Sequence, residues 1–407
     1  MQIIRMCFWG PTLCVCLMLT GRAQEPTAPI TEVSAQEMAL LAASISSESS
    51  TAPVIRSVAP GTWQVGSSVT MDMALILDVA GAYFSQAPQP AGAHDPNKTG
   101  FTFQQLELSA GASVDTYFRL DTNIVFSQFG VEVEEAYAST IAMPAGLKVR
   151  LGQFLTRVGR HNTTHPHAWY FIDSMLVSGK FWGPEANRGL GVELSWLAPL
   201  PWYFELIGTE TDAAGEETSR SWLGGSEYAV GSVTDFLTTL VAKQYWDLGA
   251  NWGLSHGMSY QSGPNNTGLS NRSEIYATDI MLRFRPSTSR KRAGLTLQSE
   301  LLHRRRQVPG DVLADWGGYI YEVWHISANW ELGARQERVS GLAADYLDPQ
   351  WTDRRDRYSA QLTWYPSHFS RLRLQGNYDK PAWRPEPIVG VMLGAEFTIG
   401  AHGAHAY

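Results

Sequence analysis

The stretch Arg371-Leu372-Arg373-Leu374-Gln375-Gly376-Asn377-Tyr378 decides the fold, because polar and apolar residues alternate along it. Successive side chains of an extended strand point to opposite faces, so the two arginines and the two amides share one face. The leucines and the tyrosine share the other face. A strand of this kind separates an apolar surface from a polar one.

The same alternation recurs along most of the chain, for example in residues 147–151 and 279–285. It predicts sixteen β-strands, at 69–83, 101–112, 116–127, 131–142, 147–157, 189–198, 202–210, 239–249, 252–262, 273–286, 293–305, 316–328, 330–341, 356–366, 369–380 and 387–399. The mean hydropathy of −0.17 is too polar for a bundle of membrane helices. The net charge of −8 argues against a nucleic-acid partner, because phosphate binding needs a basic surface.

The connections between these strands differ in length in a regular way. Those after even-numbered strands are short. Those after odd-numbered strands are mostly long, at 84–100, 158–188, 211–238, 263–272, 306–315, 342–355 and 381–386, with 128–130 as the short exception. This alternation is typical of an up-and-down antiparallel barrel with tight turns at one end and loops at the other. We therefore expect an all-β fold, a barrel of about sixteen strands with both termini at the turn end.

The charged residues in the strands indicate a transmembrane barrel. A closed barrel of sixteen strands leaves a lumen too wide for side chains to fill, so an apolar interior would serve no purpose. The polar face is then expected to line the lumen and the apolar face to meet lipid. An arginine facing lipid near the midplane would cost about 2–4 kcal/mol. The barrel is thus predicted to lie in a bacterial outer membrane.

Aromatic residues at the strand ends fit the two belts that flank the apolar band of such barrels. They are Trp63, Tyr83, Phe101, Tyr117, Trp196, Trp202, Tyr203, Trp252, Tyr260, Trp330, Trp364 and Tyr365. The chain also stops at an aromatic residue, Tyr407, after an apolar strand. Outer-membrane barrels typically end this way, and the barrel-insertion machinery recognises that end, so we expect this machinery as a partner.

The N-terminal residues predict export. Residues 1–23 resemble a secretory signal peptide, with Arg5 ahead of an apolar run that is too short to span a membrane. All three cysteines lie in this segment, so the exported chain is expected to have no disulfide or thiolate chemistry. Residues 24–67 are predicted to form a flexible or partly helical periplasmic segment, and residues 68–407 to form the barrel.

Residues 131–138 (VEVEEAYA), 147–154 (LKVRLGQF) and 159–162 (GRHN) resemble the porin families related to the phosphate-selective O/P porins. Residues 165–169 (HPHAW) resemble more closely the bacterial proteins labelled zinc-regulated TonB-dependent outer membrane receptors. The resemblance covers about residues 68–407 and implies a sixteen-stranded outer-membrane channel that forms a homotrimer. A TonB-dependent transporter has 22 strands and a plug domain, which this length cannot supply.

The charges predicted to face the lumen are nearly balanced, seven positive against eight negative. They are Arg119, Lys148, Arg150, Arg283, Arg285, Arg371 and Arg373 against Glu107, Asp121, Glu132, Glu134, Glu193, Glu205, Asp279 and Glu300. Rings of a single sign select ions, whereas a balanced wall suits small polar solutes or ions with modest charge preference. We expect a porin for passive diffusion. The alternative is a metal-responsive, zinc-linked outer-membrane receptor or binding protein that does not conduct.

No enzyme is expected, because the chain has no G-x-S-x-G elbow, no H-E-x-x-H motif and no Gly-rich phosphate loop. Glu134 and Glu135 are neighbours in a predicted strand, so they should point to opposite faces and fail as a glycosidase pair. The run Arg304-Arg305-Arg306 is predicted to form a basic patch at the outer rim, in contact with anionic lipid.

The connection 158–188 is the predicted site of any specific chemistry. In trimeric porins a long loop in this part of the chain often folds inward and narrows the pore. Its His161, His165 and His167 could gather around a zinc ion, since neutral imidazole is a common zinc ligand. Asp173 or Glu185 would complete that site. The alternative is that these imidazole rings only pack or form hydrogen bonds within a compact loop, and no other cofactor is expected.

Overall fold

A computed structural model describes residues 55–59, 62–65, 69–215, 217–225, 231–286, 293–342 and 351–400 of the chain. The predicted signal peptide, most of the predicted segment 24–67 and the terminal Tyr407 lie outside the described residues, as does the side chain of Trp63. Among the described residues no helix is both long and apolar enough to cross a membrane.

Most of the described chain is β-strand. The strands are Ile55–Ala59 (β1), Thr62–Val65 (β2), Val69–Phe84 (β3), Gly100–Ser113 (β4), Phe118–Ser127 (β5), Gly130–Thr140 (β6), Leu147–Leu155 (β7), Arg188–Leu197 (β8), Tyr203–Thr211 (β9), Leu237–Asp247 (β10), Trp252–Asn265 (β11), Gly268–Phe284 (β12), Gly294–Val308 (β13), Asp311–His325 (β14), Trp330–Val339 (β15), Arg355–Ser367 (β16), Ser370–Pro381 (β17) and Ile388–Gly400 (β18). One short α-helix, Leu176–Phe181 (α2), and four 3-10 turns, Pro144–Gly146 (η1), His161–Thr163 (η2), Pro166–Ala168 (η3) and Val233–Asp235 (η4), complete the elements.

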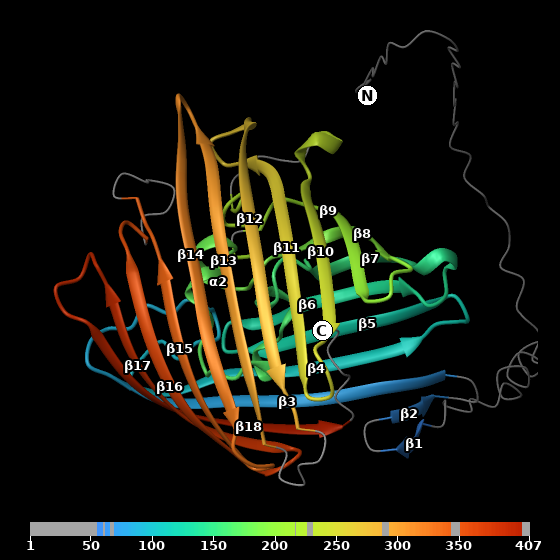
Figure 1. Ribbon diagram of the computed structural model, residues 1–407, viewed down its shortest axis with the longest axis horizontal. Helices are drawn as coiled ribbons and strands as arrows, with labels where there is room; N and C mark the ends of the chain where they lie inside the picture. The colour runs from blue at the N-terminus through green and yellow to red at the C-terminus, as the bar shows by residue number, and fades with distance from the viewer. Residues whose placement is uncertain are drawn as a thin grey trace, which may run out of the picture. The chain divides into compact units, whose positions relative to one another are not determined.

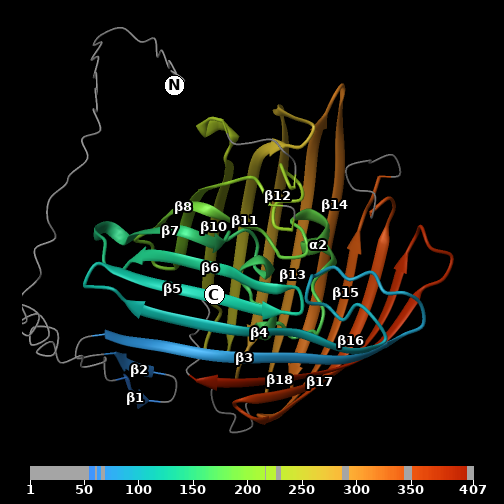
Figure 2. The same cartoon turned by 180° about the vertical axis from the view of Figure 1, so that it is seen from behind.

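Strands β3 to β18 form a closed antiparallel barrel. Each of these strands pairs with its neighbours in sequence, and β18 pairs with β3 from Gly390↔Phe84 to Gly400↔Ala74. Figures 1 and 2 show this ring, with the hairpin β1–β2 beside the start of β3. The prediction of an all-β barrel of sixteen strands is confirmed, and the hairpin lies within the segment 24–67.

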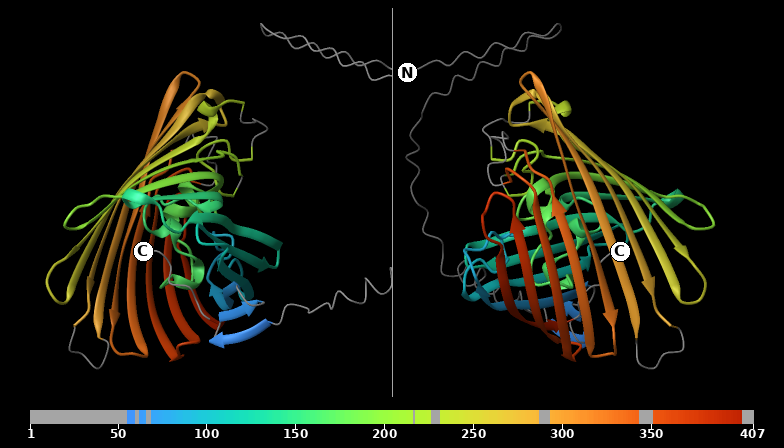
Figure 3. Two further views of the ribbon diagram at one scale, coloured as in Figure 1. Left: turned by 90° about the vertical axis from the view of Figure 1, so that its right-hand side faces the viewer. Right: turned by 60° about the vertical axis from the view of Figure 1, so that its left-hand side comes forward.

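Two connections predicted as long loops are extended hairpins instead. Strands β11 and β12 continue to a turn at 266–267, and β13 and β14 continue to a turn at 309–310. These strands therefore rise above the rest of the wall at the end that carries the remaining long loops (Figure 3). We call this the loop end of the barrel, and the opposite end, with the short connections, the turn end.

The two faces of the strands are divided as the alternation predicts. On β17 the side chains of Arg371, Arg373 and Gln375 are buried inside the barrel, while Leu374 and Tyr378 are exposed on its outside. Most of the predicted belt aromatics are likewise exposed on the outer face. Tyr365 is an exception, because its hydroxyl donates to Glu331 at 2.9 Å inside the turn end.

The lumen contains an apolar core, so the prediction that its interior has no apolar packing is wrong. Inward side chains of β10, β12, β13, β14 and β15 pack against apolar side chains of the loops. The cluster consists of Ala91, Val158, Phe171, Met175, Leu176, Val177, Phe181, Trp182, Ala213, Trp222, Leu223, Leu237, Ile275, Ala277, Leu302, Tyr319, Tyr321, Val323, Val339 and Trp351. Loops that fold inward supply the volume that wall side chains alone could not fill, and burial stabilises each large apolar side chain by about 1.5–3 kcal/mol.

Candidate functional site

The connection between β7 and β8, residues 156–187, crosses the lumen. It leaves the wall and returns to it at one place, since the amide of Thr156 donates to the carbonyl of Asn187 at 3.0 Å. Between these points it contains η2, η3 and α2 and contacts strands around the barrel (Figures 1 and 2). We call residues 156–187 the lumen loop. The predicted connection 158–188 thus has nearly the predicted bounds and folds inward.

Arginines of β15 to β17 hold one side of the lumen loop by its main chain. Arg371 donates to the carbonyl oxygens of Trp169 at 2.9 Å and of His167 at 2.5 Å. Arg373 donates to the carbonyl of Phe171 at 3.2 Å, and Arg357 donates to that of Ser174. Hydrogen bonds from a charged donor are among the stronger ones, so these contacts fix the path of the segment 167–174.

Asp173 is the centre of the same side. Its carboxylate accepts from Arg335 at 2.6 Å and pairs with Arg357 at 2.9 Å, and the amides of Gln375 and Asn377 donate to it at 2.6 and 2.7 Å. Burial alone would raise the pKa of Asp173, but the two guanidinium groups hold its pKa well below the usual range. Asp173 is therefore an anchor of the loop and is not near the histidines, contrary to its predicted role as a metal ligand.

Helix α2 is held in the apolar core by a buried ion pair. Lys180, only 1% exposed, pairs with Asp315 of β14 at 2.9 Å. Arg304 of β13 pairs with the same carboxylate at 2.6 Å and lies over the ring of Phe181. The prediction that residues 304–306 form a lipid-facing patch is wrong for Arg304 and Arg306, whose side chains are buried, whereas Arg305 is half exposed and pairs with Glu274.

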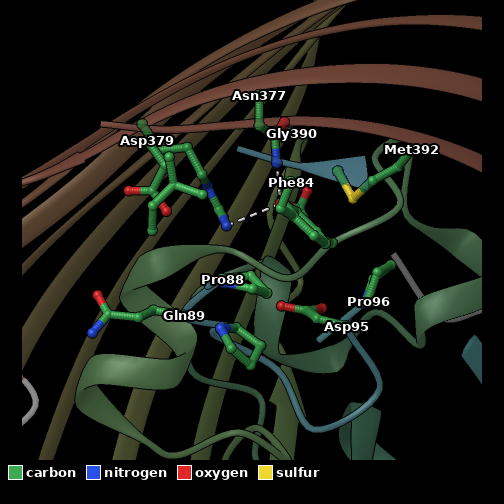
Figure 4. Close-up of a pocket in the computed structure, with 13 residues that line it drawn as sticks. Phe84, Pro88, Gln89, Asp95, Pro96, Asn377, Asp379, Gly390 and Met392 are labelled. Atoms are coloured by element: carbon green, nitrogen blue, oxygen red, sulfur yellow. Dashed lines mark hydrogen bonds and ion pairs between the residues drawn. The ribbon is translucent and has the colours of Figure 1, made fainter. Parts of the chain in front are cut away.

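The loop 85–99 covers the lumen loop at the loop end. The Oδ1 atom of Asp95 accepts from the amide of Ser174 at 2.8 Å, and His94 pairs with Glu185 at 3.3 Å. Burial alone would lower the pKa of His94, but the hydrogen bond and charge of Glu185 raise it to about 9. Glu185 therefore serves this contact and not the predicted metal site. Figure 4 shows a small pocket here, between Pro88, Gln89, Asp95 and Pro96 on one side and Asn377 and Asp379 on the other.

Glutamates of β4 and β6 surround two histidines on the opposite side of the lumen loop. The Nδ1 atom of His165 lies 2.9 Å from Glu134, and its Nε2 atom lies 3.0 Å from Glu135. The Nδ1 atom of His167 lies 2.7 Å from Glu107, and the two imidazole rings stack 5.7 Å apart. We call these five residues the histidine–glutamate cluster. All of them are buried.

The charges of the cluster act strongly on His165. Burial alone would lower its pKa, but the negative charges of Glu134 and Glu107 raise the pKa of His165 well above its usual range. In the absence of any other cation, a proton on this imidazole holds the carboxylates together.

A β-bulge brings both Glu134 and Glu135 into the lumen. Asn123 of β5 pairs with Glu135, while its neighbour Ile124 pairs with Val133, so Glu134 is an extra residue in β6. The prediction that the two carboxylates point to opposite faces is therefore wrong. They do not form an open glycosidase pair either, because the imidazole of His165 lies between them.

His161 lies outside the histidine–glutamate cluster. Its ring packs 4.8 Å from that of Trp169, and its amide donates to Glu300 at 2.7 Å. Burial, followed by the charges of Arg335 and Arg357, lowers the pKa of His161 to about 3, so this imidazole is neutral. Of the three predicted ligands the structure thus brings together His165 and His167 only.

A cavity of about 420 Å³ lies below the cluster, toward the turn end. We call it the vestibule. Its lining includes Glu135 and His165 at the top and Lys148 lower down. Three arginines in its wall are neutralised, since Arg119 pairs with Asp121, Arg150 with Glu193 and Arg157 with Glu205. Lys148 forms no ion pair with any residue that the structure describes.

The charged residues that were predicted to line the lumen lie in several different places in the structure. Glu107 and Glu134 belong to the cluster. Arg119, Asp121, Lys148 and Arg150 line the vestibule, and Arg283 and Arg285 line a second cavity of about 110 Å³ beside Tyr170. Glu132 pairs with Arg188, and Glu193 and Glu205 pair with arginines beside the vestibule. Asp279 and Glu300 are buried around Arg160, and Arg371 and Arg373 hold the lumen loop.

Comparison of the chain with known proteins gives one relative by sequence. No model of a protein family matches the chain. An uncharacterized protein of Aquifex aeolicus is 31% identical over 337 residues, which cover 76% of this chain and 71% of that protein. The chain belongs to the same family as this protein. The shared segment is long enough to include most of the barrel.

Solved structures show a similar architecture. The outer membrane channel DcaP of Acinetobacter baumannii matches with a TM-score of 0.54 and 11% identity, over 81% of this chain and 97% of that one. Outer-membrane-expressed OmpT of Vibrio cholerae matches with a TM-score of 0.52 and 9% identity, over 82% and 99%. OprB of Pseudomonas putida matches with 0.51 and 11%, over 82% and 94%. At these identities the likeness shows the fold, which is that of a transmembrane β-barrel.

Proposed function

We propose that the protein is an outer-membrane porin, a water-filled channel for passive diffusion of small polar or ionic solutes. The observation that carries this proposal is the division of the sixteen-stranded wall into an apolar outer face and a charged inner face around the vestibule. Such a wall places leucine and valine against lipid and water inside. The likeness to the channel DcaP and the resemblance to the phosphate-selective O/P porins support it.

The charges of the vestibule favour solutes of modest charge. Its arginines pair with carboxylates, while Lys148 forms no ion pair with any described residue. Phosphate selectivity, as in the O/P porins, would require a concentration of unneutralised basic residues. We therefore do not propose phosphate selectivity for this chain. The lumen loop lies above the vestibule and would set the size limit of a solute.

The resemblance to the O/P porins also supports the location and the oligomeric state that we propose for the channel. The barrel would lie in outer-membrane lipid as a homotrimer, with both termini in the periplasm. Chemical cross-linking of the native membrane tests the trimer, because a ladder that stops at the monomer contradicts it.

Conductance tests the proposal directly. The purified barrel in a planar lipid bilayer is expected to give discrete ohmic steps in potassium chloride, with similar permeability of the two ions. The absence of steps at every salt concentration would rule out a porin. Strong selectivity for either ion would instead contradict the proposed lack of charge preference.

One observation favours a second function, that of a receptor or binding protein that does not conduct. The apolar core fills the lumen beside β12–β15, and four of the connections between strands contribute to it. If these contacts leave no water-filled path, the protein would bind a ligand at its loops without passing it. Bilayer recordings with no conductance, together with a folded barrel, are the outcome that this alternative predicts.

A further inference from the structure

The histidine–glutamate cluster has the donor atoms of a metal site. Glu107, Glu134 and His165 each present one ligand atom, and these atoms lie within 4.8 Å of one another. They come from β4, β6 and the lumen loop, so the cluster forms only when the loop is in place. Around a bound zinc ion, carboxylate oxygen and imidazole nitrogen lie about 2.0–2.2 Å from the metal, which a small inward movement of each side chain would provide.

The cluster carries an excess of buried negative charge. Even when both imidazoles are protonated, the three carboxylates leave the cluster with a net charge of −1, because −3 + 2 = −1. Within the described part of the chain no arginine or lysine forms an ion pair with Glu107, Glu134 or Glu135. Uncompensated buried charge is costly, so a further cation would stabilise the cluster.

An unsatisfied oxygen marks the place where that cation would bind. Glu107 is fully buried, and its Oε1 atom has no hydrogen-bond partner. This atom lies 3.7 Å from Nδ1 of His165 and therefore points toward the group shared with Glu134. Buried carboxylate oxygens are almost always hydrogen-bonded or bound to a cation.

We propose that Glu107, Glu134 and His165 bind a divalent transition-metal ion, zinc being the best match, and that His167 and Glu135 support these ligands. One nitrogen and two carboxylate ligands form a mixed set that suits zinc. Ca²⁺ and Mg²⁺ prefer six or more oxygen ligands and fit poorly here. His167 and Glu135 hold Glu107 and His165 by hydrogen bonds, as neighbours of metal ligands usually do.

The vestibule gives a metal ion access to the site, and the bound ion would link the lumen loop to the wall. Glu135 and His165 line the vestibule, so a hydrated ion can approach the cluster from the turn end. Once bound, it would join the lumen loop to β4 and β6 without a proton on His165. The binding is independent of whether the barrel conducts.

Isothermal titration of the untagged full barrel in detergent with zinc chloride tests this site. We expect one tight binding event for the natural chain, and at least a tenfold weaker affinity for E107Q and for H165N. E132Q serves as the matched control, because Glu132 lies on the same strand β6 but pairs with Arg188 outside the cluster. H161N is the control within the lumen loop. Both controls should bind like the natural chain.

Three results would overturn the proposal. One is the absence of zinc binding to a natural chain that shows the heat-modifiable gel migration of a folded barrel. The second is equal binding by E107Q and H165N, which would place the ion elsewhere. The third is calcium binding as tight as zinc binding. Cobalt(II) absorption supplies a separate check, since d–d bands should arise in the natural chain and in E132Q and be lost in H165N.

Discussion

The two sides of the lumen loop are held by different chemistry. On the side of β15–β17, arginines donate to main-chain carbonyls and to Asp173. On the side of β4–β6, His165 and His167 contact three glutamates, and no described arginine or lysine pairs with these. Arginine keeps its charge at every physiological pH, whereas histidine needs a proton or leaves room for a metal ion.

This difference teaches that one contact of the loop is permanent and the other adjustable. On the arginine side the chain itself provides both the cations and the carboxylates that pair with them. The histidine–glutamate side carries uncompensated charge and is completed by a small cation.

Removal of the lumen loop should have the largest effect. Because Thr156 and Asn187 are hydrogen-bonded, residues 158–185 can be replaced by two glycines without stretching the wall. We expect the single-channel conductance to rise severalfold, since a loop that crosses the lumen limits the current. Conductance equal to that of the natural chain, from a barrel with heat-modifiable migration, would show that the loop does not narrow the path.

Substitution R357A should break the arginine side. Arg357 pairs with both Asp173 and Glu337, so its loss would leave these two buried carboxylates with Arg335 as the one arginine that they share. The loss of one partner of a buried ion pair costs about 3–5 kcal/mol in the free energy of unfolding. Urea unfolding in lipid vesicles measures this change. R338A, which removes an exposed arginine paired with Asp356, is the matched control and should cost about 1 kcal/mol or less.

Alkaline pH should weaken the attachment beside β4. His94 contacts the carbonyl of Gln104 on β4 and pairs with Glu185, and its pKa is raised from 6.5 to about 9. A raised pKa stabilises the folded state fully below the unfolded pKa, and this contribution is lost as the pH rises through about 9. A shift of this size corresponds to about 3 kcal/mol at most. The melting temperature should fall between pH 6.5 and 9, and E185Q should remove most of that fall.

Substitution K148Q should have the smallest effect. Lys148 lines the vestibule without an ion-pair partner in the described part of the chain, so its loss should shift the reversal potential in a salt gradient slightly toward cation preference. The conductance itself should hardly change. K380Q is the control, because Lys380 is exposed on the outer face of β17. A shift toward anion preference in K148Q would contradict the assignment of this residue to the conducting path.

Much of the wall could be predicted from the sequence, because alternation of period two reports directly which face of a strand is polar. Residues 371–378 lie as their pattern predicts. The bulge at Glu134 also has a signal in the sequence. Polar residues at 132 and 134 are followed by polar residues at 135, 137 and 139, so the alternation changes phase at the extra residue. Two neighbouring polar residues indicate a bulge when the alternation on either side of them is out of phase, as it is at Glu134 and Glu135.

The contents of the lumen could not be predicted in the same way. Asp173 meets Arg335 across 162 residues of sequence, and no local pattern connects them. The apolar residues of α2 are of the same types as the residues that face lipid, so residue type alone does not show that they are buried inside the barrel. Their burial there depends on the path of the lumen loop. His165 and His167 could be singled out by residue type, but the carboxylates beside them come from β4 and β6 and become neighbours only through tertiary folding.

The contacts from wall arginines to loop carbonyl oxygens have one further consequence. Every residue type carries a carbonyl, so Arg371 and Arg373 recognise the course of residues 167–171 without regard to the side chains there. These contacts alone would therefore tolerate new side chains in the segment, and the limits on exchange come from other contacts, such as those of His167 with Glu107 and of Phe171 in the apolar core.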